Sequence, residues 1–199
     1  AAVIYFEFLK PPKADYIRDV RFKAKGNRLS VLLITVDALR VDYVSANGYP
    51  QKITPAIDGL ASAGLNFTKA VTPIPKTTQS LASLLTGRYP HKTGVRNLWN
   101  ALPQDIITLT EVLKNIKYQT VAVVSNHNLI PDRNLARGFD HYDFESDKRD
   151  AMETTQSVLS HFERTNTRNP FFIWVHYIDP HVPYFPPESI VRELDPDYQ

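Results

Sequence analysis

The sequence predicts an α/β fold in which a mostly parallel central sheet carries helices on both faces. Three short apolar runs rich in β-branched or aromatic residues, 31–36, 120–124 and 171–175, are typical of strands that are buried on both sides. Segments with helix signals separate these runs. Strands that alternate with helices indicate an α/β sandwich with a parallel sheet.

Capping signals predict the helices between the strands. Thr54 and Pro55 supply an N-cap and a first-turn proline, and Thr108 with Glu111 forms a capping box. Gly87 ends another apolar helix. The predicted helices therefore cover 54–64, 80–86, 108–116 and 149–164, and the apolar stretch 65–71 is predicted as a further strand.

Composition excludes several classes of function. The chain has 199 residues, 43% hydrophobic and 22% charged, which is typical of one soluble globular domain or a piece of a larger one. The net charge of +2 and the scattered Lys and Arg residues do not suggest a nucleic-acid-binding protein, so no nucleic-acid partner is expected. The chain has no cysteine, which excludes disulfides, zinc–thiolate sites and thiol nucleophiles.

Residues 1–29 are predicted as an N-terminal lead-in, and residues 30–199 as the folded part. The lead-in contains a Pro-Pro pair and the basic run 21–28. Its apolar stretch 1–9 is about half the roughly 20 residues that a membrane span needs. That stretch is interpreted either as the tail of a preceding anchor or as an ordered N-terminal arm.

Three polar segments follow the buried strands. Asp37 comes after the first strand, 125–128 after the second and 176–181 after the third. Because ligands collect at the carboxyl ends of parallel strands, we expect these segments to lie close together. Asp37 can bind a hard divalent cation there, or it can cap the next turn and pair with Arg40.

Hydroxyl and imidazole groups supply further candidate chemistry. Thr77 and Thr78 precede the apolar helix, where hydroxyls act as N-caps but also lie at an anion-binding position. A threonine is a nucleophile only if a metal or a base lowers its pKa. His176 and His181 can contact an anion or protonate a leaving group, and one of the two can be structural.

Four segments resemble signature motifs of the sulfatase family, within the alkaline phosphatase superfamily. Residues 48–61 are similar to "GY…TPNLDxLA", 84–95 to "LLTGRYPHxTGV", 138–142 to "GFDxY" and 180–183 to "PHxP". The resemblance implies an alkaline-phosphatase-like sandwich, and residues 30–199 are then expected to be the N-terminal part of a truncated catalytic domain. The Asp-His pair at 140–141 falls inside the third motif and is interpreted as structural rather than as a pair of metal ligands.

The sequence departs from the family at the residue that cleaves sulfate esters. Sulfatases carry "CxPSR", whose cysteine matures to formylglycine. The corresponding run here is 77–81, with Thr77 at the cysteine position and Leu81 at the arginine position. No formylglycine is therefore expected.

Other groups that bind the sulfate or its metal are also replaced. Ala38 follows Asp37, where the family has a second aspartate. Asn126 and Asn128 stand where the family has the lysine and histidine of "GKWH". These replacements make phosphate esters candidate substrates beside sulfate esters.

A threonine at the nucleophile position resembles the phosphoglycerol and phosphoethanolamine transferases of bacterial envelopes. This resemblance implies that Thr77 is the nucleophile and, with Asp37, a metal ligand, and that His181 contacts the substrate or its leaving group. Thr78 is the alternative nucleophile. The candidate substrate contacts are Lys76, Thr78, Asn126 and His176.

The implied cofactor is a divalent metal: Ca²⁺, Mg²⁺, Mn²⁺ or Zn²⁺. Its other ligands lie downstream in the family, so we expect the remainder of a longer polypeptide, or a second chain, to complete the site. The implied substrate is a phosphate or sulfate ester, linked to a lipid or a glycan, and the implied location is extracytoplasmic, in the periplasm or cell envelope, with a membrane anchor in the full-length protein. Two alternatives stay open: a sulfuric ester hydrolase that works without formylglycine, and a non-catalytic module with the sulfatase fold.

Overall fold

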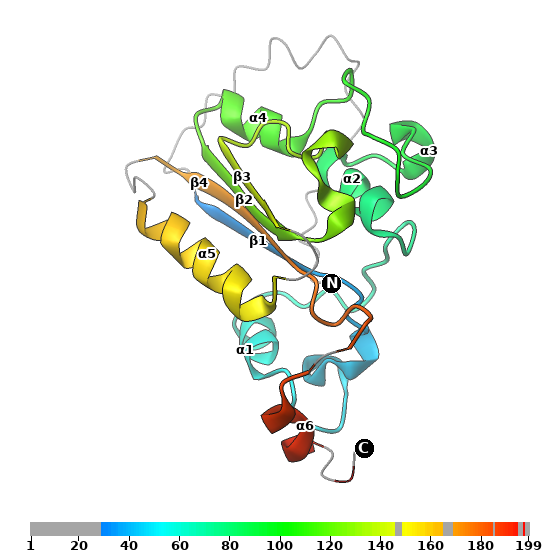
Figure 1. Ribbon diagram of the computed structural model, residues 1–199, viewed down its shortest axis with the longest axis vertical. Coiled ribbons are helices and arrows are strands. Elements are labelled where there is room, and N and C mark those ends of the chain that lie inside the picture. The colour runs from blue at the N-terminus through cyan, green and yellow to red at the C-terminus, as the bar shows by residue number, and fades with distance from the viewer. Residues whose placement is uncertain (1–28, 146–148, 165–168, 185, 195–196, 198–199) are drawn as a thin grey trace.

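The structure is a computed structural model that describes residues 29–145, 149–164, 169–184, 186–194 and 197. Its centre is a four-stranded sheet with the strand order β1-β4-β2-β3, in which all neighbouring strands run parallel (Figure 1). The strands are β1 (Val31–Val36), β2 (Gln119–Ser125), β3 (His141–Glu145) and β4 (Phe171–Tyr177). The predicted parallel sheet is confirmed. Apart from Leu29, the predicted lead-in lies outside the described residues.

Helices cover both faces of the sheet, as predicted. Figure 1 shows α2 and α4 on one side of the strands and α5 on the other. Among the described residues, no helix is long and apolar enough to cross a membrane. The helices are α1 (Pro55–Ala63), α2 (Thr77–Thr86), α3 (Pro90–Thr93), α4 (Leu109–Asn115), α5 (Ala151–Arg164) and α6 (Glu188–Leu194).

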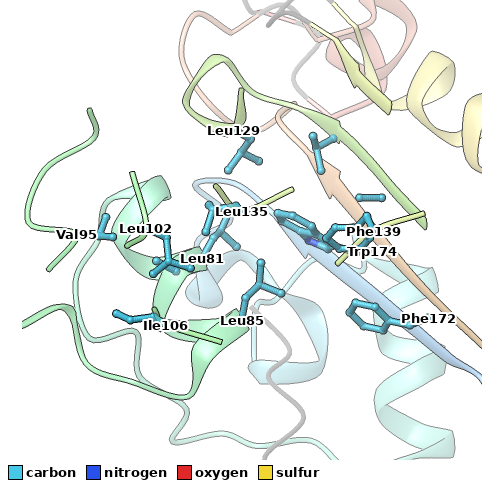
Figure 2. Packing of buried hydrophobic residues seen from close by; sticks show 13 residues of the cluster. Leu81, Leu85, Val95, Leu102, Ile106, Leu129, Leu135, Phe139, Phe172 and Trp174 are labelled. Atoms are coloured by element: carbon cyan, nitrogen blue, oxygen red, sulfur yellow. The ribbon is translucent and has the colours of Figure 1, made fainter. Parts of the chain in front are cut away.

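The main core lies between the sheet and α2, and the alternation of side chains along β4 builds it. Phe172 and Trp174 point to the α2 side and belong to one buried cluster with Leu85 and Phe139 (Figure 2). The ring of Phe139 stacks on that of Trp174 with the centroids 5.9 Å apart. His176, two residues further along β4, therefore points to the same side and reaches the carboxyl edge beside α2.

Two predicted elements differ from the structure. The stretch 65–71 is not a strand: Leu65 and Val71 are each 85% exposed, and no described strand pairs with it. An apolar segment forms a strand only where its backbone can hydrogen-bond to a neighbouring strand, and residues 65–71 do not pair with the described sheet. Helix α2 begins at Thr77, three residues before the predicted start at Ser80. The start was predicted too late because the first turn of α2 is polar, and the prediction relied on apolar residues.

Strand β3 was not predicted, because its alternate residues are polar and it lies at a sheet edge. The loop before it is held tightly. Asp140 Oδ2 accepts hydrogen bonds from the Thr120 backbone N–H (3.0 Å) and hydroxyl (3.1 Å), and Lys114 pairs with the same carboxylate at 2.9 Å. These contacts agree with a structural role for Asp140, whereas His141, the other residue of the predicted pair, lies in a group that could hold a metal ion.

Any side chain at position 138 should destabilise the fold. The φ of Gly138 is +84°, and a Cβ would lie 2.4 Å from the backbone N of Glu111. We expect Gly138→Ala to lower the free energy of unfolding by roughly 2–4 kcal/mol, since overpacking adds to the cost of a positive φ. Gly87→Ala is the matched control: its φ is +64°, but nothing lies within 4 Å of its Cβ, so only about 1–2 kcal/mol is expected. Urea denaturation of both variants measures the difference, and equal losses would contradict the steric argument.

Candidate active site

Three parallel strands bring polar side chains to one edge of the sheet. Asp37 follows β1, Asn126 follows β2 and His176 lies next to the end of β4. The Asp37 backbone N–H extends the ladder by donating to the Tyr177 carbonyl at 2.8 Å. The predicted gathering of these segments is confirmed by the contacts that their side chains make.

The Asp37 carboxylate is the centre of these contacts. Its Oδ2 atom accepts hydrogen bonds from the Thr77 hydroxyl at 3.0 Å and from the Asn126 side-chain amide at 2.6 Å. His176 Nε2 lies 3.6 Å from the same oxygen. One carboxylate oxygen thus joins residues from two strand ends and one helix.

The residue after Asp37 has a strained backbone. Ala38 has a φ of +54°, a left-handed conformation that costs an L-residue about 1–2 kcal/mol. Such residues concentrate at functional sites, where the surrounding contacts hold them in place. The position that carries a second aspartate in sulfatases is therefore occupied here by a small residue in a tight turn.

A hydrogen-bond network behind His176 sets the orientation of its buried ring. Its Nδ1 lies 2.8 Å from the Thr35 hydroxyl, which accepts from Trp174 Nε1 at 3.0 Å and donates to the Val175 carbonyl at 3.2 Å. When the single Thr35 proton is donated to the Val175 carbonyl, His176 donates from Nδ1, and the neutral form of the ring then has its lone pair on Nε2. That Nε2 atom is buried, has no hydrogen-bond partner among the described residues and faces Asp37.

Burial of the Asp37 carboxyl raises its pKa, but the neighbouring groups outweigh this effect. His176 lowers the pKa of Asp37 most strongly, followed by the Thr77 hydrogen bond and the charge of His181. This attraction belongs to the protonated form of His176, whose Nε2 lies 3.6 Å from Asp37 Oδ2, longer than an ordinary hydrogen bond. The pKa of Asp37 therefore lies below its usual value, and the group is a carboxylate at neutral pH.

Asp37 Oδ2, the Thr77 hydroxyl and His176 Nε2 form a donor set that fits a divalent metal ion. A carboxylate, a hydroxyl and an imidazole suit Zn²⁺ or Mn²⁺ better than Ca²⁺, which takes about six to eight oxygen ligands. Within the described ranges, Asp37 does not belong to any close group of three His, Cys, Asp or Glu ligands. Among the described residues, this group would therefore supply part of the ligand set of such a site.

Helix α2 presents Thr77 to the carboxylate. Thr77 is the first residue of α2, and Lys76 occupies the preceding N-cap position with an exposed side chain. Backbone N–H groups of a first helical turn have no partner within the helix, and the helix dipole favours an anion at this end. Thr77 and Lys76 thus lie where a phosphate or sulfate group would be stabilised.

The structure separates Thr78 from the group around Asp37. Thr78 is fully buried, and its hydroxyl donates to the Leu98 carbonyl at 3.0 Å and lies 3.4 Å from the Asn128 carbonyl. These contacts attach two loops to α2. The burial does not support Thr78 as a substrate contact or as the alternative nucleophile.

The two remaining predicted contacts occupy different environments. Asn126 is buried, and its Oδ1 accepts from the Asn128 backbone N–H at 2.8 Å, which orients the amide toward Asp37. Asn126 is therefore a buried hydrogen-bond donor to Asp37 and not an exposed side chain. His181 is half-buried, with Nδ1 2.6 Å from the Val182 carbonyl.

Sequence reasoning missed Thr35. It is the polar residue in the otherwise apolar run 31–36, and a polar group inside a buried strand needs a hydrogen-bond partner. The need for a hydrogen-bond partner could have identified Thr35 from the sequence. The identity of that partner depends on the strand register, which pairs Thr35 with His176.

Comparison with known proteins gives one family. The sulfatase family model matches residues 30–193. Arylsulfatase A from Bos taurus is 38% identical over 97 residues, which cover 46% of this chain and 19% of that protein. The match thus spans about a fifth of the length of this curated relative.

Solved structures agree on the fold. The phosphonate monoester hydrolase of Agrobacterium radiobacter superposes with a TM-score of 0.73 at 19% identity, over 86% of this chain and 45% of that one. The C-terminal periplasmic domain of EptC from Escherichia coli, in complex with zinc, superposes with a TM-score of 0.62 at 20% identity, over 87% and 51%. At such identities the likeness establishes the fold alone.

In the metal-free protein, the contribution of Asp37 to stability should depend on pH. A carboxyl whose folded pKa is depressed stabilises the fold above its unfolded pKa, about 3.9, and that stabilisation is lost as pH falls through the lower folded pKa. We expect Asp37→Asn to lower the free energy of unfolding near neutral pH and to have a smaller effect below about pH 3. Urea denaturation in the presence of a chelator tests this, and a pH-independent effect would contradict it.

Proposed function

This chain belongs to the sulfatase family, and on that basis we propose that the protein transfers or hydrolyses a phosphate or sulfate ester with Thr77 as the nucleophile. The observation that carries the proposal is the 3.0 Å contact between Thr77 Oγ1 and Asp37 Oδ2 at the head of α2. This contact supports a mechanism in which the Thr77 hydroxyl and the Asp37 carboxylate bind the same metal ion.

The electrostatics of Asp37 support its role as a ligand rather than as a base. A general base works best with a pKa near the working pH, whereas the pKa of Asp37 is depressed. Asp37 instead accepts a hydrogen bond from the Thr77 hydroxyl and so fixes the orientation of Thr77 Oγ. A divalent cation bound by Asp37 and His176 would lower the pKa of the Thr77 hydroxyl and neutralise charge on the ester.

The N-terminus of α2 supports recognition of the ester group. Backbone N–H groups of the first turn and the exposed Lys76 side chain surround the position of Thr77. Charge that develops on the transferred group is stabilised mainly by such donors and cations. His181 donates from Nδ1 to the Val182 carbonyl, which leaves its Nε2 to contact the leaving group.

The proposed reaction has two steps. The Thr77 hydroxyl loses its proton to solvent, Oγ bonds to phosphorus as the bond to the leaving-group oxygen breaks, and that oxygen takes up a proton from solvent, so that no net proton is gained or lost. Water or a second alcohol then attacks the phosphothreonine and restores Thr77. We favour a phosphate ester because the chain has no cysteine to mature to formylglycine.

Two other functions each have one observation in their favour. The 38% identity to arylsulfatase A favours a sulfuric ester hydrolase that works without formylglycine. The incomplete ligand set among the described residues favours a non-catalytic module with the sulfatase fold. A panel of aryl sulfates and phosphodiesters separates these possibilities: turnover of sulfates alone supports the first, and no turnover by metal-loaded protein supports the second.

The proposal includes a partner and a location. The missing metal ligands come from the remainder of a longer polypeptide or from a second chain, and the ester is carried on a lipid or a glycan. The periplasmic domain among the structural neighbours supports an extracytoplasmic location. A membrane anchor elsewhere in the full-length protein would bring the site close to a lipid-linked substrate.

Substitution of Thr77 should remove the activity of the intact protein. We expect Thr77→Ala to lower kcat by at least about 10³-fold, and Thr77→Ser to retain part of it, because serine keeps the nucleophilic oxygen. The matched control is Thr78→Val, which removes the neighbouring hydroxyl but should leave the kcat of the folded protein nearly unchanged. Trapping of phosphothreonine at residue 77 by mass spectrometry is the direct check. Loss of activity in the Thr78 variant alone would overturn the assignment.

Removal of the Asp37 charge should weaken metal binding. We expect Asp37→Asn to raise the Kd for Zn²⁺ or Mn²⁺ at this site by at least about tenfold, since a metal prefers a charged carboxylate to an amide. Asp42→Asn is the control, because Asp42 is exposed on the same loop and pairs with Arg40. Isothermal titration calorimetry measures both, and equal Kd values in the two variants would contradict the proposed ligand.

A further inference from the structure

A second group of metal-binding side chains lies away from the active site. His141, Asp143 and His161 each offer a ligand atom, and these atoms all lie within 4.8 Å of one another. The two imidazole rings have their centroids 4.1 Å apart, and His161 Nε2 lies 4.0 Å from Asp143 Oδ2. Two imidazoles and a carboxylate are a typical set of protein ligands for zinc.

Local structure explains why these residues meet. His141 and Asp143 are two positions apart on β3, so their side chains leave the same face of the strand. Tyr142 and Phe144, which alternate with them, pack into the core on the α2 side. His141 and Asp143 therefore face α5, which carries His161.

The Asp143 carboxylate is already held in one orientation. Arg149, which is almost fully buried, donates to Asp143 Oδ1 at 2.9 Å and to the Val124 carbonyl at 2.9 Å. Ser157 donates to Oδ2, the oxygen that faces His161. Groups that fix a carboxylate in this way orient it as a metal ligand, and Arg149 contacts Oδ1, whereas Oδ2 lies nearer to His161 Nε2.

The environment of His161 favours its neutral, metal-binding form. Burial lowers the pKa of His161, the neighbouring His141 lowers it further, and Asp143 only partly opposes both effects. The neutral ring, which is the form that binds metal, is thereby favoured. Ligand atoms around a tetrahedral zinc lie about 3.3 Å apart for bonds of about 2.0 Å. The three side chains, whose ligand atoms lie within 4.8 Å of one another, would therefore have to move closer together around a bound ion.

This group is distinct from the candidate active site. Strand β3 is the edge strand opposite β1, which carries Asp37 at its end. His141 pairs with Val121 near the start of β2, whereas Asn126 follows the end of β2. The group also lies on the α5 face of the sheet, whereas Thr77 belongs to α2 on the other face (Figure 1).

We propose that His141, Asp143 and His161 bind a zinc ion that clamps α5 to the edge strand β3. The three residues leave a fourth position for water, and the bound ion links the helix to the strand. His141 is then a ligand with Asp143 and His161 rather than with Asp140, which is used in the loop before β3. The site is independent of the function proposed for Thr77.

Zinc binding by the intact protein tests the proposal. Asp37→Asn weakens zinc binding at the candidate active site, and we expect this protein to retain at least one zinc equivalent after dialysis, measured by inductively coupled plasma mass spectrometry. His141→Ala in that background should lose this equivalent, and His161→Ala should lose it too. The control is His91→Ala, which removes an exposed histidine of α3 that lies outside the group.

Thermal unfolding gives a second readout. Zinc should raise the Tm of the Asp37→Asn protein by several degrees, and His141→Ala should abolish the rise, since a ligand that binds only the folded state stabilises it. Because His141 is exposed, this variant folds even if His161→Ala does not. Loss of both the zinc equivalent and the Tm rise supports the site. Unchanged zinc content or an unchanged Tm rise in His141→Ala overturns it.

Discussion

The arrangement at the carboxyl edge depends on one carboxylate oxygen, Asp37 Oδ2. It accepts hydrogen bonds from the head of α2 and from the loop after β2, and it faces the imidazole of β4. A buried carboxylate is costly unless donors and positive charge surround it. Thr77 and Asn126 supply the donors, and His176 adds positive charge when its ring is protonated, so the residues that stabilise the charge are also those that assemble the site.

The core holds this arrangement in place. Trp174 packs in the main cluster with its ring against Phe139, and its indole N–H donates to Thr35. The Thr35 hydroxyl then sets the ring of His176. Packing and site chemistry are thus coupled through one hydroxyl, and loss of Thr35 would leave buried polar atoms without partners as well as releasing the imidazole.

The two faces of the sheet carry different groups of polar side chains. On the α2 face, β4 carries His176 toward Asp37, which also contacts the first residue of α2. On the α5 face, the edge strand β3 carries His141 and Asp143 toward His161. The period of two along a strand makes this separation possible, because adjacent residues of one strand belong to opposite sides of the sheet.

The sequence by itself determined the α/β class, the three strands with continuous apolar runs, and the gathering of Asp37 with the segments after β2 and β4. Those runs carry their signal locally, because strands buried on both faces need apolar residues at every position. The predicted burial on both faces is wrong for the edge strand β1, where Leu32 and Ile34 are 47% and 40% exposed. Tertiary structure decided the rest. Residues 65–71 pair with no described strand. The more polar segment β3 is a strand because its backbone pairs with the edge of β2. Side-chain roles were also decided there: the register of β1 against β4 places Thr35 beside His176, 141 positions away, and no local pattern encodes that pairing.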